Sequence, residues 1–416
     1  KYLQSPITKA VITVPAYFDE AARSMTRDAA RLAGLEVLRL VNEPTAAALA
    51  YGLEKSVEGL CAIYDLGGGT FDVSLLRLEG QIFQGLATGG DVHLGGDTFD
   101  EILVAHLAQG CTLRQARMLR ESLSTQDSVT YEINDIPYTL SRDTLEVFMA
   151  PMLTRTFEIL QNVLEDAGVR PQDLQGLVLV GGMTRTPKIV TDLTHFLGKS
   201  PLVDINPDQV VVWGAALQAQ GLSHGTGPLL MDVTPLSLGL EMMGGIVEKL
   251  IPRNSPIPIS KQQDFTTYQE GQTAMMLHVL QGERELVSGC RSLARFELQD
   301  LPAQIAGSVR VEVTFTLDVD GLLTVTAQEK THGTPTRIEV KPTHGLTSAD
   351  FERMLLENAQ QAGNDMQIRL LQETKVDAQR LLDTCSQALK EDGFLLSSTN
   401  QLAIQTCLKN LEETIE

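Results

Sequence analysis

The first half of the chain alternates short apolar runs with segments of helical periodicity. Strand-like runs occur at residues 10–14, 60–64, 70–78 and 174–180. The run at 174–180 leads into a segment over 187–197 whose apolar residues recur at helical spacing. Strands that alternate with helices predict an α/β class for residues 1–221.

The pattern changes after residue 221. Residues 222–232 indicate an interdomain linker, which begins with small polar residues and ends in the apolar run Leu229, Leu230 and Met231. Between 233 and 344 the pattern is β only. Residues 310–318 alternate apolar and polar side chains, and Asp320 with Gly321 predicts a hairpin turn after them. Several short strands in this length predict a β-sandwich.

The segment from 345 to 416 has helical periodicity. Thr347 and Asp350 have the spacing of a capping box at a helix start. The apolar residues that follow at helical spacing are Phe351, Met354, Leu355 and Ala359. This stripe predicts a helix that lies on an apolar surface, and it identifies no ligand.

Composition narrows the function classes. The chain has 33 Lys and Arg against 53 Asp and Glu, a formal net charge of −20, which disfavours nonspecific binding to nucleic acid or to an anionic membrane. Its five cysteines form no CxxC pair, so we expect neither a disulfide framework nor a zinc site. Scattered thiols suit a reducing compartment, so we expect the protein to be cytoplasmic. The chain begins at Lys1, without methionine, so we expect residues to precede it in the parent protein.

The clearest chemical signal is a glycine turn between two predicted strands. Asp65 and Asp72 flank the segment Gly67, Gly68, Gly69 and Thr70. Glycines without a Cβ let a phosphate chain approach backbone amides, and two carboxylates suit a hydrated Mg²⁺. The Thr70 hydroxyl suits a phosphate oxygen or an attacking water. The alternative is an ordinary glycine hairpin whose aspartates only cap the turn.

Two further segments have similar chemistry. Gly181 and Gly182 precede a helix opened by Pro187, and helix N-termini attract anions. Arg185 is planar and could stack on an adenine ring. Glu43 begins a helix of small residues and is expected to face an interior site. For Gly181, Gly182 and Arg185, the alternative is an ordinary strand-to-helix turn with a solvated arginine. For Glu43, the alternative is a helix cap followed by close helix packing.

In this order the segments resemble the heat shock protein 70 (DnaK) family of chaperones. The matching segments are residues 14–18, 42–48, 65–72, 93–97, 180–187, 232–239 and 280–284. Residues 252–254, 263–267, 271–275 and 290–296 resemble most the branch of the family that serves iron–sulfur cluster assembly. The resemblance implies α/β actin-like (ribonuclease H-like) ATPase lobes, incomplete at the N-terminus. A β-sandwich peptide-binding domain and an incomplete helical lid would follow.

The resemblance also implies roles for individual residues. The catalytic set would be Glu43, Asp65, Thr70 and Asp72, with Mg²⁺ held by Asp65 and Asp72 through water. ATP or ADP would be bound by Gly67, Gly68, Gly69, Gly95, Gly96, Ser124, Gly181, Gly182, Arg185 and Asp208. Coupling between domains would involve Pro15, Arg23, Leu229, Leu230 and Asp232.

An extended peptide would be bound by apolar side chains of the predicted β-sandwich. By resemblance these are Leu240, Met243, Phe265, Tyr268, Met275 and Leu277. Met243 and Tyr268 would arch over the peptide backbone, and methionine adapts its shape readily to different partners. From periodicity alone, the same residues are plain sandwich core.

Two departures from the family pattern bear on activity. The family's first phosphate hairpin and its lysine do not precede Lys1, so we expect this chain alone to hydrolyse ATP poorly or not at all. The stretch from Phe99 to Thr130 is short, and it offers Arg117 and Arg120 where the family has a glutamate and a lysine. We expect this exchange to remove an acceptor for the ribose hydroxyls and to weaken nucleotide binding.

The resemblance therefore implies an ATP-dependent chaperone that acts on the iron–sulfur scaffold protein. A J-domain co-chaperone would assist it, and the chaperone would be monomeric. Three alternatives remain: a general DnaK-like folding chaperone, a small-molecule kinase of the actin-like fold, and a peptide-binding module without ATPase activity. The β region after Asp232 argues against the kinase, which has no use for it.

Overall fold

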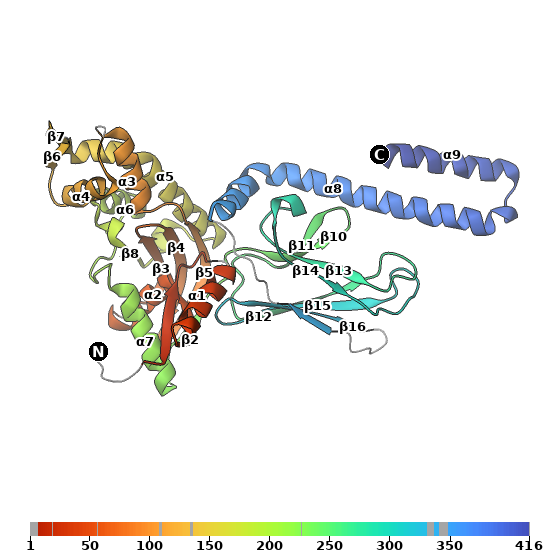
Figure 1. The fold of residues 1–416 in the computed structure, drawn as a ribbon, viewed down its shortest axis with the longest axis horizontal. Helices are drawn as coiled ribbons and strands as arrows, with labels where there is room; N and C mark the ends of the chain where they lie inside the picture. The colour runs from red at the N-terminus through yellow and green to blue at the C-terminus, as the bar shows by residue number, and fades with distance from the viewer. Residues whose placement is uncertain are drawn as a thin grey trace.

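The computed structural model describes residues 7–18, 20–55, 57–107, 110–133, 136–225, 227–330, 337–340 and 348–415. An α/β part, formed by residues up to His224 with the short strand β9, lies beside a β part formed by later residues. A long helix extends along the β part, and a shorter helix folds back beside its far end (Figure 1). The mixed α/β architecture predicted for the first part is confirmed.

The α/β part contains most of the described helices. Its helices are α1 (Glu20–Leu32), α2 (Glu43–Lys55), α3 (Gly96–His106), α4 (Leu113–Leu123), α5 (Arg142–Asp166), α6 (Pro187–Leu197) and α7 (Val210–His224), with short 3₁₀ helices at Pro171–Asp173 and Gly182–Arg185. Its strands are β1 (Lys9–Val14), β2 (Glu36–Asn42), β3 (Gly59–Leu66), β4 (Phe71–Glu79), β5 (Ile82–Asp91), β6 (Ser128–Ile133), β7 (Ile136–Ser141), β8 (Gly176–Val180) and β9 (Leu229–Met231).

A five-stranded sheet forms the centre of this part. Its order is β8-β3-β4-β5-β9, with antiparallel pairs in the middle and parallel pairs at both edges. β1 and β2 form a separate parallel pair, and β6 and β7 form an antiparallel hairpin. The predicted strands at 60–64 and 70–78 correspond to β3 and β4, whose register places Asp65 directly opposite Asp72.

Small residues determine how the helices pack on this sheet. Residues 46–50 of α2, four alanines and a leucine, are completely buried against β3, β4 and α7. A Cβ on Gly214 of α7 would lie 1.8 Å from the Ala46 carbonyl oxygen, so only glycine permits this approach. The close contact fixes α2, and therefore Glu43 at its first position, relative to the sheet.

The predicted linker has more regular structure than its sequence indicates. Residues 222–224 continue α7, and Leu229–Met231 form β9, which pairs in parallel with β5. Leu230 is only 3% exposed, and it packs in the same core as α2. The three apolar residues therefore form the edge strand of the sheet. The polar residues before them had instead indicated a linker. Thr226 lies outside the described residues.

The β part contains two four-stranded sheets. One has the order β11-β10-β13-β14 and the other β12-β15-β16-β17. The strands are β10 (Leu238–Met242), β11 (Ile246–Ile251), β12 (Ile259–Thr266), β13 (Met275–Gln281), β14 (Arg291–Leu298), β15 (Arg310–Leu317), β16 (Leu323–Glu329) and β17 (Arg337–Val340), with a 3₁₀ helix at Val287–Gly289. Both sheets contribute to one apolar core, in which Val279, Val313 and Phe315 are fully buried.

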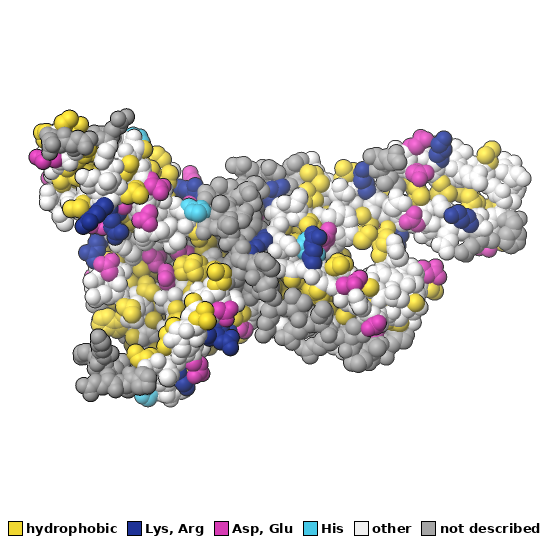
Figure 2. Space-filling model, viewed as in Figure 1, with side chains coloured by type: hydrophobic (Ala, Val, Ile, Leu, Met, Phe, Trp, Pro, Cys, Tyr) yellow, Lys and Arg dark blue, Asp and Glu magenta, His cyan; other side chains and the backbone are white. Residues whose placement is uncertain are grey.

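The chain continues in helix α8 (Ser348–Asp392), a 3₁₀ turn at Gly393–Leu395 and helix α9 (Ser398–Ile415), which turns back toward α8. The predicted cap at Thr347 lies outside the described residues. Among the described helices, none combines the length and apolar character needed to cross a membrane. On the face drawn in Figure 2, basic and acidic side chains lie next to one another, so the net charge forms no single acidic patch there.

Candidate functional site

A cavity of about 640 Å³ lies between the glycine turn after β3 and the turn after β8. Its lining residues are Gly67, Gly68, Gly96, Asp97, Arg117, Arg120, Glu121, Ser124, Thr125, Gly182, Met183, Arg185 and Asp208. Seven predicted nucleotide-binding residues are in this set: Gly67, Gly68, Gly96, Ser124, Gly182, Arg185 and Asp208. The two glycine turns, more than a hundred positions apart in sequence, therefore face one shared space.

The remaining glycines of the prediction hold the turns against one another. A Cβ on Gly95 would lie 2.5 Å from the Gly69 carbonyl carbon. Gly181 has φ of 84°, and a Cβ there would lie 2.3 Å from the Leu66 carbonyl oxygen and 2.9 Å from an Asp65 oxygen. Neither position accepts a side chain, so both glycines are required for the shape of the cavity.

Three acidic side chains lie behind the glycine turn. Asp65 and Asp72 are 8% and 1% exposed, and Tyr17 donates its N–H to an Asp72 oxygen at 3.3 Å. Burial, followed by the nearby Glu43 carboxylate, raises the pKa of Asp72 to about 7. Burial, then Asp72 and Glu43, raises the pKa of Asp65, and burial raises the pKa of Glu43. The three carboxylates therefore repel one another when ionised.

A hydrated divalent cation fits this set of oxygen ligands, because it would relieve the repulsion. In the part of the chain that the structure describes, no three or more His, Cys, Asp or Glu side chains are arranged to hold a metal directly. Coordination through water, as predicted for Asp65 and Asp72, stays a prediction.

Arg117 and Arg120 of α4 are already paired with carboxylates. Arg120 is 7% exposed and binds Asp100 through two hydrogen bonds of 2.7 and 3.1 Å, with its third nitrogen 2.7 Å from the Met183 sulfur. Arg117 pairs with Glu121 at 2.9 Å. Glu121 lines the cavity, so the cavity keeps a carboxylate acceptor that the sequence analysis missed. The four-residue spacing of Arg117 and Glu121 is the signal that could have identified it.

Arg185 is held in place at the opposite wall. Its guanidinium donates to Asp208 at 2.5 Å and to Asn206 at 3.1 Å, and about half of each charged side chain is exposed. Both acceptors bind the same nitrogen, Nη2, and hold the end of the guanidinium at this wall. The structure thus brings together Arg185 and Asp208, which were predicted separately.

A second cavity, of about 450 Å³, opens on the β part. Its lining includes all six predicted peptide-binding residues: Leu240, Met243, Phe265, Tyr268, Met275 and Leu277. The sequence analysis missed further lining residues, which are Glu241, Met242, Gly244, Gly245, Thr266, Gln272, Met276 and His278. Met275 is 8% exposed and Met243 is 51% exposed, so the cavity has an apolar floor and an open rim.

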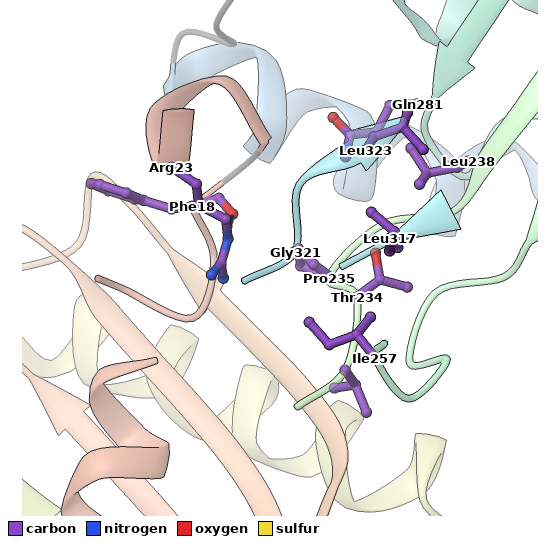
Figure 3. A pocket seen from close by; sticks show the side chains of 11 residues that line it. Phe18, Arg23, Thr234, Pro235, Leu238, Ile257, Gln281, Leu317, Gly321 and Leu323 are labelled. Carbon is purple, nitrogen blue, oxygen red and sulfur yellow. Dashed lines mark hydrogen bonds between the residues drawn. The ribbon is translucent and has the colours of Figure 1, made fainter. Parts of the chain in front are cut away.

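A small pocket marks the contact between the two parts (Figure 3). Arg23 of α1 lines it together with Pro235, Gly321 and other residues of the β part. Arg23 is 4% exposed and donates to the Asp320 carbonyl oxygen at 3.3 Å. The Asp320 carboxylate accepts from the Leu40 N–H at 3.0 Å and from Arg27. Sequence analysis identified Asp320 only as a turn residue.

Among the other predicted coupling residues, Asp232 also contacts the α/β part. The Thr45 side chain donates to Asp232, and the Pro15 carbonyl oxygen accepts from the Phe18 N–H at 3.1 Å in the turn before α1. A second contact was not predicted: Arg253 pairs with Asp166, and the Asn254 side chain accepts from a β5 amide at 3.2 Å. The α/β and β parts are therefore joined by two sets of contacts.

Comparisons with known proteins identify the family of the chain. The family model described as Hsp70 protein matches residues 1–126 and 116–416. The "Chaperone protein HscA homolog" of Pseudomonas aeruginosa is 50% identical over 99% of this chain and 69% of its own length. Proteins of the same name from Pseudomonas fluorescens and Cupriavidus taiwanensis are 48% identical over 99% of this chain and 69% and 70% of their own lengths.

Proposed function

The chain belongs to the Hsp70 family, and from that premise we propose that it is an ATP-dependent molecular chaperone dedicated to iron–sulfur cluster assembly. The observation that carries the proposal is the presence of two cavities in one chain. The first is lined by the glycine turns, behind which Asp65 and Asp72 are buried, and the second has a largely apolar floor. Arg23 contacts both parts of the molecule.

The first cavity is suited to a nucleotide. Gly67, Gly68 and Gly182 leave room for the phosphates, while Arg185 offers its guanidinium plane to the base and Glu121 an acceptor to the ribose. Mg²⁺, held by Asp65 and Asp72 through water, would neutralise developing charge on the transferred phosphoryl group. Glu43 and Thr70 would orient the attacking water, because positioning contributes most of the catalysis in phosphoryl transfer.

The second cavity is suited to an extended peptide. Such peptides are recognised by main-chain hydrogen bonds together with pockets for one or two side chains. The floor contains Leu240, Phe265 and Leu277, and four methionines line the same space. Their flexible thioethers adapt to different side chains at low cost. The two sheets around this cavity would be the peptide-binding β-sandwich, and α8 with α9 the lid.

The proposed client is the iron–sulfur scaffold protein, recognised through a short proline-containing loop, with a J-domain co-chaperone that stimulates ATP hydrolysis. Similarity to proteins named HscA supports this branch of the family. An affinity near micromolar, about −8 kcal/mol, would suit repeated binding and release. The kinase alternative finds no support among these relatives.

A peptide array tests the client assignment against the general DnaK-like alternative. Overlapping peptides from the scaffold protein and from unrelated unfolded proteins would be probed with the purified chain. The proposal predicts strong binding to one proline-containing segment and weak binding elsewhere. Equal binding to many apolar peptides would favour the general chaperone.

A further inference from the structure

A glutamate, a histidine and a serine form a hydrogen-bonded chain across three neighbouring strands of the β part. Glu241 lies on β10, His278 on β13 and Ser292 on β14. The Nδ1 atom of His278 lies 2.5 Å from a carboxylate oxygen of Glu241, and its Nε2 atom lies 2.9 Å from the Ser292 hydroxyl oxygen. The function proposed above assigns no chemical step to these three side chains.

The pairing of the strands explains how these side chains meet. β10, β13 and β14 are neighbours in the sheet order β11-β10-β13-β14. Leu277 and Val279, on either side of His278, belong to the apolar core, so His278 points to the opposite face of the sheet. A register shift between β13 and β14 sets Ser292 opposite Leu280. Such bulges re-aim side chains, and here the Ser292 hydroxyl is directed to the imidazole.

The partners of the imidazole determine which of its nitrogens carries the proton. An ionised carboxylate can only accept a hydrogen bond, so Nδ1 of His278 donates to Glu241. In the neutral imidazole, Nε2 is then unprotonated and accepts from the Ser292 hydroxyl. The three groups are therefore arranged as a carboxylate, a base and a nucleophile, and the base is placed to take the proton of the serine.

Access from solvent differs along this chain of groups. The His278 side chain is only 4% exposed, whereas Ser292 is exposed. The base is therefore shielded from water, while the hydroxyl that it contacts can meet a reagent. Arg295 is also exposed, and it is the cross-strand partner of His278. The Cβ atoms of such partners lie about 5 Å apart, so the guanidinium can approach negative charge that develops beside the serine.

We propose that Ser292 is a nucleophile that accepts acyl groups from small activated esters, with His278 as its general base and Glu241 as the positioning residue of the histidine. The Ser292 oxygen attacks the carbonyl carbon, and its proton passes to His278 Nε2. The bond between that carbon and the leaving oxygen breaks, and the alcohol departs with the proton. The products are an acyl-serine and an alcohol, so the step needs no oxidant or reductant. This reactivity goes beyond the chaperone function and does not depend on it.

A fluorophosphonate reagent tests the nucleophile, because it forms a stable bond with activated serines. The full chain is incubated with the reagent, and the modified residue is identified by mass spectrometry. Wild type is expected to be labelled at Ser292, and Ser292→Ala is expected to remain unlabelled. Ser260 is the matched control, because it is also exposed on a β-strand but its hydroxyl pairs with Thr316 at 3.0 Å. Ser260→Ala is expected to be labelled like wild type.

Acylation kinetics with p-nitrophenyl acetate separate the roles of the other two residues. The release of p-nitrophenolate gives a limiting rate and the ester concentration at half of that rate. His278→Gln is expected to lower the limiting rate about a hundredfold, within the usual contribution of a general base. Glu241→Gln keeps the size of the side chain and removes its charge. It is expected to lower the limiting rate about tenfold and to leave the half-saturating concentration unchanged, which a loss of structure would not do.

Two results would overturn the proposal. One is labelling of Ser292 no faster than labelling of Ser260 in the wild-type protein. The other is an unchanged limiting rate in both His278→Gln and Glu241→Gln. Because His278→Gln alters a buried side chain and could unfold the β part, the unfolding midpoint of each variant is compared with wild type. The comparison of Ser292 with Ser260 uses the folded wild-type chain, so it decides the nucleophile even if that variant fails to fold.

Discussion

The guanidinium of Arg23 donates a hydrogen bond to the main-chain carbonyl of Asp320, 297 residues further along the chain, at 3.3 Å. The same group donates to the Asn42 side chain at 2.6 Å, and Asn42 directly precedes Glu43. One buried side chain therefore contacts a segment behind the nucleotide cavity and the hairpin between β15 and β16. Arg23 is therefore in direct contact with both parts of the molecule.

Replacing Arg23 by alanine should weaken the contact between the two parts. The change leaves buried acceptors at Asn42 and Asp320 without this donor, which costs about 1 to 3 kcal/mol. We expect a protease specific for large apolar residues to cleave near Leu229–Met231 several-fold faster than in wild type. Arg31→Ala, an exposed change at the end of the same helix, is the control and should leave the rate unchanged. Equal cleavage of all three proteins would contradict the role of Arg23.

Two glycines with positive φ provide a matched pair of substitutions that tests which residue determines the shape of the first cavity. Gly181 has φ of 84° and no space for a Cβ, whereas Gly198 has φ of 70° and no atom within 4 Å of an added Cβ. Both changes to alanine cost about 1 kcal/mol of backbone strain, but only Gly181→Ala must displace Leu66 and Asp65. We expect calorimetric titration with Mg-ADP to show binding lost in Gly181→Ala and retained in Gly198→Ala. Retained binding in both would count against the cavity assignment.

The buried carboxyl of Asp72 should make stability depend on pH. Its pKa is raised from 3.8 to about 7. Between these values the folded protein keeps a proton that the unfolded chain releases, so this residue's contribution to stability is lost as the pH rises from about 4 to about 7. Asp72→Asn removes the ionisation. Without magnesium, the unfolding free energy of Asp72→Asn should exceed that of wild type by about 2 to 3 kcal/mol more at pH 8 than at pH 5.

Thermal or denaturant unfolding at the two pH values measures this difference. Asp204→Asn changes an exposed aspartate and should show no such dependence. A gain for Asp72→Asn that is the same at pH 5 and pH 8 would show that the carboxyl is not held protonated.

A charge on the floor of the second cavity should weaken peptide binding. Met275 is 8% exposed, and Met275→Asp places a carboxylate there without a partner. We expect at least a tenfold loss of affinity, measured by fluorescence anisotropy, while Met275→Leu keeps the volume and the affinity. Met118→Asp adds the same charge at a site that is 58% exposed in the α/β part, and it should bind normally.

Because Met275→Asp could unfold the β part, its circular dichroism and unfolding midpoint are compared with wild type. Met243→Ala at the exposed rim provides a milder variant, with an expected loss of about fivefold. Unchanged affinity in both variants would show that the peptide does not bind in this cavity.

Local patterns were sufficient for the elements whose signal lies within a few residues. Alternation over 310–318 and the turn at Asp320 predicted β15 and β16, and the apolar runs beside the glycine turn predicted β3 and β4. The glycine turns were identified in the sequence as candidate phosphate sites, because close approach of a phosphate to the backbone depends on a missing Cβ. That both turns face one cavity follows from the β3–β8 pairing, which local periodicity does not specify.

Pairings between distant residues could not be predicted from the sequence. Arg120 lines the first cavity, but two of its nitrogens donate to Asp100, 20 positions earlier, and this pairing was not predicted. Asp320 was interpreted as a turn residue, because its partners lie about 280 to 300 positions away. The strand at Leu229–Met231 was interpreted as linker, because only the exposed edge of β5 makes it a strand. Each of these depends on the folded surroundings.

In an ATP-dependent chaperone, a nucleotide in the first cavity changes the affinity of the second cavity for a peptide. The most direct test is the anisotropy titration of a fluorescent apolar peptide with the wild-type chain, with and without saturating Mg-ATP. We expect at least a fivefold change in the dissociation constant of the peptide, which corresponds to a coupling free energy of about 1 kcal/mol or more. The same dissociation constant under both conditions, with both ligands shown to bind, would contradict it.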